Sequence, residues 1–291
     1  NPQQSPASSL ETLSKAIVHA ANMPGVTVIN MSVTACVPAT AKVEMSTLKG
    51  ALYYASVVKD IVVVASAGNT ASSGACTANP LPDPADPTDP RGWSKVQTVS
   101  LPSYLDQFVL SAAGTTLTGD PYVNTLGGPW VDVSAPAINI VSLDPVNGSR
   151  GRLINAEIGS DGKTIPLSGT SFGAAYISGL AALVRQRFPE LTAYQVRNRI
   201  INSGHRPATG MRNLLGESVA DPVAALTGDY PVGPPAAQGV PSRPVAAPKV
   251  ADSPFPVGRI VAGSFLGVMV LALIVGAVVT WFRSIGKRRM R

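Results

Sequence analysis

The segment that decides the fold reads Leu167-Ser-Gly-Thr-Ser-Phe-Gly-Ala-Ala-Tyr-Ile-Ser-Gly-Leu-Ala-Ala-Leu-Val184. Its apolar residues recur with the spacing of one helix face, at positions 172, 176, 177, 180 and 184. This pattern predicts a buried helix over residues 171–187, whose small residues let neighbouring backbone come close. Ser171 would lie at its first turn, beside unpaired backbone N–H groups that stabilise negative charge on a reacting group.

A second segment, Asp60-Ile-Val-Val-Val-Ala-Ser-Ala-Gly-Asn69, decides whether Ser171 has a chemical role. Serine or threonine before a helix is most often an ordinary N-cap, so Ser171 needs a partner. The apolar run of this segment predicts a buried parallel strand over residues 61–66 that leads to Asn69. Ligands bind beyond the carboxyl ends of strands in open α/β sheets. The Asn69 amide can therefore donate to the oxyanion that a serine attack creates.

These two motifs resemble those of the subtilisin-like serine peptidases. Gly169-Thr-Ser171 is similar to the nucleophile motif of that family, and Ala67-Gly-Asn69 is similar to its oxyanion-hole motif. The predicted strand over residues 26–33 resembles the substrate-binding strand, and Val131-Asp-Val-Ser-Ala-Pro136 resembles the strand and turn before the serine segment. The resemblance extends over about residues 9–205. It implies an α/β fold with a subtilisin-like parallel sheet flanked by helices.

The resemblance also implies a reaction, the hydrolysis of peptide bonds through an acyl-enzyme. Ser171 would be the nucleophile, and Asn69 with the Ser171 backbone N–H would form the oxyanion hole. The backbone of four substrate-binding residues would line or pair with an extended peptide; these are Ser32, Val33, Thr34 and Gly68. No cofactor is expected.

The family triad also needs an aspartate and a histidine, in Asp-Thr/Ser-Gly and His-Gly-Thr settings that do not occur in these 291 residues. Neither of the two histidines present is expected to be the catalytic base. His19 falls on the surface of an amphipathic helix, and His205 follows a helix C-terminus. We therefore expect the catalytic Asp and His on an N-terminal segment outside this sequence. Without that segment, the chain would be a very poor protease.

Another enzyme class shares part of the serine motif. Gly169-Thr-Ser-Phe-Gly173 also fits Gly-x-Ser-x-Gly, the nucleophile elbow of α/β-hydrolases. That fold needs a strong apolar strand before the serine, and an acid followed by a histidine after it. Here Thr164-Ile-Pro-Leu167 is short and contains a proline, and His205 precedes Asp221. The chain order favours the subtilisin-like interpretation.

The order of the remaining elements predicts the same architecture. Helices over residues 9–22 and 45–58 alternate with the strands over residues 26–33 and 61–66, which is typical of a parallel sheet covered by helices. Short strands are expected at residues 107–111, 129–133 and 137–141. A last helix with a capping box should run from Thr192 to about residue 202.

The two cysteines are expected at one edge of this sheet. Cys36 follows the first predicted strand and Cys76 follows the second, so both would lie at the carboxyl ends of neighbouring strands. A disulfide is the favoured interpretation and two free thiols the alternative. A disulfide would place the domain outside the cytosol. Two cysteines with no histidine nearby cannot fill a tetrahedral site, so no metal ion is expected.

Charge and hydropathy divide the chain. Six of its 23 basic residues and none of its 17 acidic residues lie beyond residue 258, so residues 1–258 carry 17 of each and no face for nucleic acid is expected. The uncharged 23-residue run over 260–282 predicts a membrane span, with its basic flank in the cytoplasm. Five regions follow: a linker-like segment 1–8, a catalytic domain 9–226, a proline-rich linker 227–258, a transmembrane helix 259–283 and a basic tail 284–291.

The cysteine pair, the acidic proline-rich loop over residues 78–93 and the membrane tail make the chain most similar to the mycosins, the membrane-anchored subtilases of mycobacterial type VII secretion systems. This resemblance implies a single-pass membrane protein with an extracytoplasmic, periplasmic catalytic domain. Its partners would be a peptide or protein substrate, the membrane and subunits of a secretion complex. A subunit that mainly stabilises or caps that complex, with proteolysis secondary, is the alternative.

Overall fold

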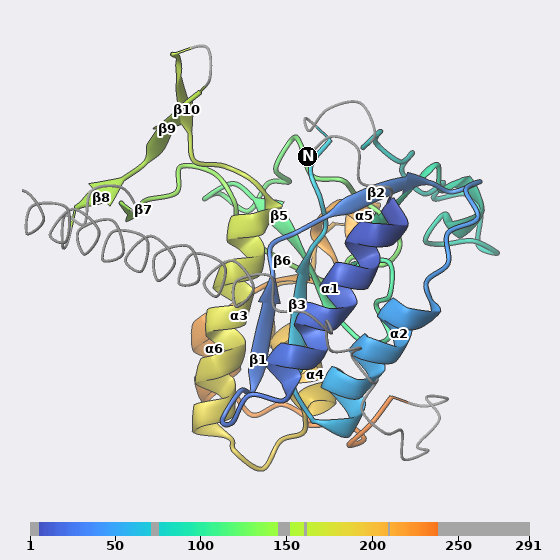
Figure 1. Cartoon of the computed structure of the whole chain (residues 1–291). Coiled ribbons are helices and arrows are strands. Elements are labelled where there is room, and N and C mark those ends of the chain that lie inside the picture. Colours follow the sequence, from blue (N-terminus) through green and yellow to red (C-terminus); the bar gives the residue numbers. More distant parts are fainter. Residues whose placement is uncertain (1–5, 71–75, 145–151, 160–161, 209, 238–291) are drawn as a thin grey trace, which may run out of the picture. The chain divides into compact units, whose positions relative to one another are not determined.

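The computed structural model describes residues 6–70, 76–144, 152–159, 162–208 and 210–237 (Figure 1). The chain divides into two units, residues 1–248 and 249–291, and the second lies wholly outside the described residues. So do the expected transmembrane helix 259–283 and the basic tail 284–291, along with most of the expected linkers 1–8 and 227–258. No helix in the described ranges is long and apolar enough to span a membrane. The predicted domain bounds stay predictions.

A five-stranded sheet forms the centre of the first unit. Its strands are all parallel and stand in the order β1-β3-β5-β6-β11. Their bounds are β1 (Val28–Met31), β3 (Val62–Ser66), β5 (Leu110–Thr115), β6 (Val133–Pro136) and β11 (Ser218–Val219). The predicted parallel sheet is therefore confirmed, with β1 at one edge and β11 at the other.

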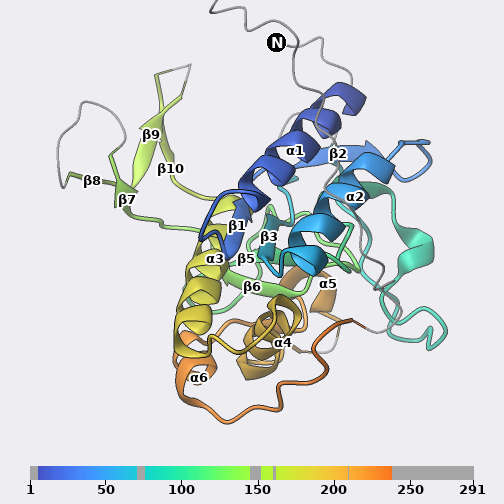
Figure 2. The ribbon, with the colours of Figure 1, turned by 60° about the horizontal axis from the view of Figure 1, so that its bottom comes forward.

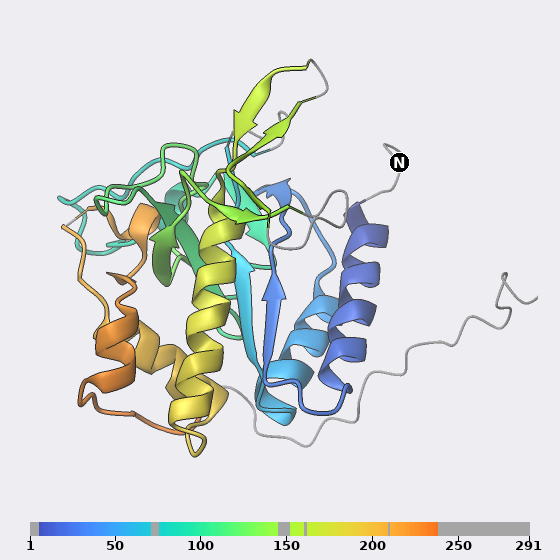
Figure 3. The ribbon, with the colours of Figure 1, turned by 90° about the vertical axis from the view of Figure 1, so that its left-hand side faces the viewer.

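Helices cover both faces of this sheet, as Figure 2 and Figure 3 show. On one face lie α1 (Pro6–Ala21), α2 (Ser46–Tyr53) and the π-helical turn η1 (Tyr54–Val58). On the other face lie α3 (Thr170–Arg187), α4 (Ala193–Ser203) and α6 (Pro222–Thr227). The short α5 (Arg212–Leu215) precedes β11. This arrangement is the expected α/β architecture.

The strand β3 shows why the sequence folds in three layers. Its alternate residues Val63 and Ala65 pack into the apolar core beneath α1 and α2. Val62 and Val64 point the other way, into the core beneath α3 and α4. A strand covered on both faces must be apolar at every position, which explains the uninterrupted run of valines.

The remaining strands form three antiparallel pairs outside the central sheet. β2 (Ala35–Pro38) pairs with β4 (Thr98–Leu101), beside the ends of β1 and β3. β7 (Ser142–Leu143) pairs with β8 (Leu153–Ile154), and β9 (Ala156–Ile158) pairs with β10 (Thr164–Pro166). These last two pairs form an arm that stands out from the layered body in Figure 3. A short 3-10 turn, η2 (Trp93–Lys95), closes the proline-rich loop.

Two predicted strands are misplaced and one is wrong. The regular strands begin at Leu110 and Val133, because residues 105–108 and 128–131 form turns closed by backbone hydrogen bonds. No strand forms over 137–141, where Asn139 has a φ of 53° that a strand does not allow. Trp130 and Val131 are nevertheless fully buried. An apolar run indicates that its residues are buried, but it does not show that they form a strand, and here they are buried in turns.

Candidate active site

Ser171 lies in the first turn of α3, where the chain turns out of a glycine. Gly169 is the N-cap residue, with a φ of 144° and a ψ of 154°, and its N–H donates to the backbone oxygen of Ala137 at 2.8 Å. Only glycine adopts this conformation without strain. Ser171 itself is partly exposed. Among the described residues, none forms a hydrogen bond with its hydroxyl.

The next glycine presses α3 against the sheet. A Cβ atom on Gly173 would lie 2.6 Å from the backbone oxygen of Ala113 in β5. The predicted close approach is therefore present at this position. The predicted burial of the helix is incomplete, because Tyr176 of the apolar pattern is 52% exposed, and Leu183, which lies outside the pattern, is 48% exposed. The described residues cover only one face of α3, and its apolar positions extend round to a second face.

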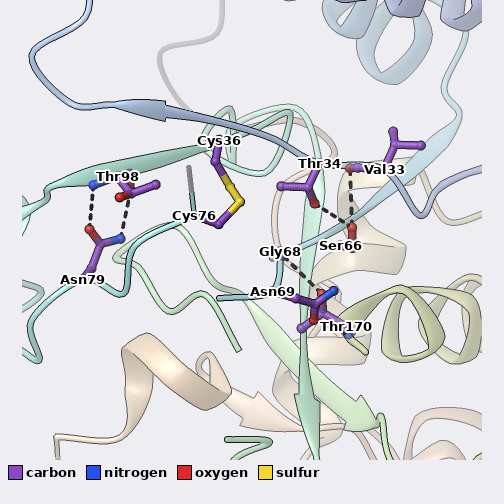
Figure 4. The surroundings of a disulfide bond; sticks show 10 residues. All are labelled: Val33, Thr34, Cys36, Ser66, Gly68, Asn69, Cys76, Asn79, Thr98 and Thr170. Atoms are coloured by element: carbon purple, nitrogen blue, oxygen red, sulfur yellow. Dashed lines mark hydrogen bonds between the residues drawn. A yellow bond between two sulfur atoms is a disulfide. The ribbon is translucent and has the colours of Figure 1, made fainter. Parts of the chain in front are cut away.

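Asn69 follows the end of β3 and lies against the start of α3 (Figure 4). The backbone N–H of Thr170 donates to Asn69 Oδ1 at 3.0 Å, and the Thr170 hydroxyl donates to the same oxygen at 3.2 Å. Gly68 N–H donates to Thr170 Oγ1 at 3.2 Å. Two segments 102 residues apart are thus joined at the residue before Ser171.

These contacts leave one half of the Asn69 amide available. Oδ1 already accepts two hydrogen bonds, whereas Nδ2 donates to no acceptor within the described part of the chain. The Nδ2 atom lies 3.4 Å from the position of a Cβ atom on Gly169. An amide whose oxygen is engaged holds its two N–H donors in a fixed direction. Asn69 is therefore oriented as a donor beside the turn that leads into Ser171.

The predicted substrate-binding segment runs past the same place. Ser32 Oγ donates to the backbone oxygen of Ser171 at 2.9 Å. The hydroxyls of Thr34 and Ser66 lie 3.2 Å apart, and Ser66 Oγ lies 3.4 Å from the backbone oxygen of Val33. Thr34 also packs against Gly68, because a Cβ atom there would meet its methyl group at 3.0 Å.

The catalytic and substrate-binding residues named from the sequence therefore gather at one end of two neighbouring parallel strands, β1 and β3. Their location supports the roles given to them, and the roles themselves stay predictions.

The expected disulfide is present beside this segment. Cys36 of β2 and Cys76 are bonded, with Cα atoms 5.3 Å apart and a sequence separation of 40 (Figure 4). The bond connects β2, which follows Thr34, with the described segment that begins at Cys76. Asn79 fastens the second of these segments further, since its amide donates to the backbone oxygens of Thr98 and Gly127.

Comparison with known proteins agrees with this geometry. A family model described as the subtilase family matches residues 2–221. The chain belongs to the subtilase family. It is 46% identical to mycosin-2 of Mycobacterium tuberculosis over 276 residues, which are 93% of this chain and 49% of mycosin-2. It is 48% identical to mycosin-1 of the same species over 235 residues, 80% of this chain and 51% of the relative.

Solved structures give the same assignment. The crystal structure of MycP1 from Mycobacterium smegmatis is 44% identical with a TM-score of 0.74, and the match covers 82% of this chain and 59% of MycP1. A chain in an intact ESX-5 inner membrane complex is 40% identical with a TM-score of 0.73, over 96% of this chain and 64% of that chain. This subtilase chain thus spans about half the length of the curated relatives it matches.

Neither histidine of this subtilase chain lies near Ser171. His19 is exposed in the last turn of α1, and the sheet separates α1 from α3. His205 bonds through its backbone to Val219 of β11, at the sheet edge opposite β1, and its Nε2 lies 3.1 Å from Asp221 Oδ2. The side-chain partner of His205 is therefore the Asp221 carboxylate. Gly204, the C-cap residue before it, is extended.

A buried ion pair at the start of β6 was not predicted from the sequence. Asp132, only 8% exposed, accepts from Arg197 Nη2 at 2.7 Å and from the backbone N–H of Ser111 at 2.8 Å. Burial raises the pKa of Asp132 to about 6, although Arg197 acts to lower it. This carboxylate connects β6, β5 and α4. An aspartate inside the otherwise apolar segment that was predicted as a strand over 129–133 was the one signal that could have indicated it.

Proposed function

We propose that the complete protein is a membrane-anchored serine endopeptidase whose catalytic domain lies outside the cytoplasm and works with a type VII secretion complex. The observation that carries the proposal is the joining of Asn69 to the turn that holds Ser171. An asparagine with donors available and a partly exposed serine hydroxyl at a helix start are the groups that acyl transfer needs.

In the proposed reaction, Ser171 Oγ attacks the carbonyl carbon of a peptide bond while a histidine takes the hydroxyl proton. Asn69 Nδ2 and the Ser171 N–H donate to the oxygen that becomes negative. The C–N bond then breaks, and the histidine gives its proton to the leaving amine. Water, activated by the same histidine, releases the acyl group and restores the serine.

We assign the catalytic histidine and aspartate to a segment outside this sequence. Three observations support this assignment. The edge strand β1 has no neighbour on its outer side among the described residues, and the outer face of α3 exposes Tyr176 and Leu183. The chain also spans about half the length of its curated relatives. An open strand edge and an exposed apolar face are both surfaces that a further segment would cover.

The substrate would bind as an extended strand along Ser32–Thr34. Val33 is 50% exposed and follows the last paired residue of β1, which leaves room for a peptide beside this segment. The disulfide next to this segment supports a location in an oxidising compartment.

A structural role in a secretion complex is the second candidate. It is supported by the similar chain within the ESX-5 inner membrane complex and by the arm, whose exposed apolar side chains suit a protein partner. These side chains are Leu143, Leu153, Ile158 and Ile165, between 45% and 78% exposed. The two candidates are compatible in one protein.

One experiment separates the candidates. The complete protein and its Ser171→Ala variant are compared in a strain that lacks the gene, both for labelling by a serine-directed fluorophosphonate and for secretion. The peptidase proposal expects labelling of the unaltered protein and none of the variant, with Ser168→Ala, which changes an exposed serine three residues away, labelled normally. Secretion that survives Ser171→Ala and is lost on deletion supports the structural role. Equal labelling of all three proteins would refute the peptidase proposal.

A further inference from the structure

A row of hydrogen bonds joins the substrate-binding segment to α3. The Ser178 hydroxyl shares its proton between the backbone oxygen of Ala174 at 2.8 Å and Asn30 Oδ1 at 3.0 Å, and Asn30 Nδ2 donates to Ser32 Oγ at 2.9 Å. Ser32 Oγ donates in turn to the backbone oxygen of Ser171 at 2.9 Å. Every donor in this row is directed toward the residue that carries the proposed nucleophile.

The strand β1 aims Asn30 at α3. Ile29 and Met31 pack in the core on the α1 face, whereas Val28 packs in the core on the α3 face. Successive side chains of a strand point to opposite faces, so Asn30 shares the face of Val28. Asn30 was not singled out from the sequence, although it is a polar residue in an otherwise apolar strand.

The amide group of Asn30 sets the direction of the whole row. Asparagine has one acceptor oxygen and one donor nitrogen, and here each has its own serine partner. Because Ser32 Oγ accepts from Asn30, the Ser32 proton is directed to the Ser171 oxygen. A carboxylate at position 30 would accept from both serines. It would therefore draw the Ser32 proton away from Ser171.

We propose that Asn30 is a positioning residue for the peptidase reaction. By fixing the Ser32 hydroxyl, it fixes the first turn of α3 against the segment that would hold the substrate backbone. A small displacement between a nucleophile and its bound substrate slows the chemical step more than it weakens binding. This inference rests on the proposed function, and it adds to that function a residue that touches neither the substrate nor the reacting atoms.

The test uses the complete protein with single and double variants. Asn30→Asp and Ser32→Ala should each lower kcat roughly tenfold, as the loss of one net hydrogen bond allows, with KM changed by less than about twofold. The double variant should be no slower than either single variant, because both remove the same bond. Ser178→Ala, which leaves the bond from Asn30 to Ser32 in place, should cost less. Asn202→Asp makes the same chemical change at an exposed position of α4 and should leave kcat unchanged.

A second measurement does not depend on activity. Backbone amide exchange in the first two turns of α3 should be faster in Asn30→Asp than in Asn202→Asp, while the melting temperatures of the two variants agree. Unchanged exchange, or additive losses in the double variant, would overturn the positioning role. Hydrolysis that persists in Ser171→Ala would instead overturn the proposed function, so the two failures are distinct.

Discussion

Two polar regions of this subtilase chain use similar bonds and leave different groups available. Around Asp132, the carboxylate is engaged by Arg197 and by a strand N–H, and the cluster is buried. Around Asn69, an equally ordered set of bonds leaves the amide nitrogen and the Ser171 hydroxyl without an acceptor or donor among the described residues. The second region, although its groups have ordinary chemistry, has the unengaged donors that a reaction requires.

In this domain, a shifted pKa alone does not identify the functional site. Burial shifts the carboxyl pKa of Asp132 strongly upward, and shifted groups often mark active sites. Its carboxylate partners nevertheless come from two elements of the fold, β5 and α4, and it connects them to the start of β6. We conclude that Asp132 connects elements of the domain, while action on substrate is the role that we propose for the Asn69–Ser171 region. Changes to single residues can test this division of roles.

The largest effect should come from Ser171→Ala. In the complete protein it should lower kcat by on the order of 10⁵- to 10⁶-fold, the size known for loss of a serine nucleophile in this kind of triad. The melting temperature should stay within a few degrees, because the hydroxyl has no partner in the described residues. Peptide hydrolysis and calorimetry measure the two quantities. If Ser171→Ala kept its kcat, the proposed catalytic role of Ser171 would be wrong.

Asp132→Ala should act in the opposite way. Loss of the carboxylate removes the ion-pair partner of the partly buried Arg197, which keeps its bond to the Asp106 backbone oxygen, so the cost should be about 3 kcal/mol of unfolding free energy, the low end for a buried pair. The kcat of the folded fraction should be retained. Chemical denaturation gives the free energy, and Glu11→Ala, which removes an exposed ion pair with Lys15, serves as the control that changes little. A stable Asp132→Ala protein with a reduced kcat would reverse our assignment.

Asn69→Ala should combine a catalytic loss with a modest structural one. Removal of an oxyanion donor typically lowers kcat by about 10²- to 10³-fold. The variant also loses both hydrogen bonds from Thr170, so a small fall in stability is expected. Steady-state kinetics with one peptide substrate should show the loss in kcat and little change in KM. If KM rose by that factor and kcat stayed unchanged, Asn69 would bind substrate without stabilising the oxyanion.

The smallest effect is the pH dependence of the Asp132 pair. The folded-state pKa of about 6 lies above the ordinary value of 3.8, so the folded state binds this proton more tightly than the unfolded state does. The unfolding free energy of the unaltered protein, compared with Asp132→Asn, should therefore rise as the pH falls from about 7 to about 4, by on the order of 1–3 kcal/mol. A difference that is flat with pH would show that Arg197 outweighs burial.

Local patterns were enough to predict much of the fold. The capping box of α4 is present as expected, with Gln195 N–H bonded to Thr192 Oγ1 and the Gln195 side chain bonded back to the Thr192 N–H. The strand β3 lies within one residue of its predicted range. Such features depend on contacts between residues a few positions apart, so a local sequence pattern is enough to predict them.

The misplaced strands show where prediction from local patterns fails. Trp130 and Val131 are as apolar as any strand residue, yet they lie in a turn that buries them. The outer face of α3 is apolar and exposed at Tyr176. In both cases composition recorded how apolar a residue is, while the neighbouring elements decided whether it pairs, turns or remains uncovered.

By itself, the sequence determined the α/β class, the parallel order of helix and strand, the cysteine pair and the two motifs that end at Asn69 and Ser171. Only the tertiary structure decided that the Asn69 oxygen is bonded to Thr170, that Asn30 directs the Ser32 hydroxyl toward α3, and that Asp132 is paired with Arg197. Most of these bonds join residues far apart along the chain. They form only once the sheet and its helices have brought distant segments together, and no local pattern encodes which side chains will then meet.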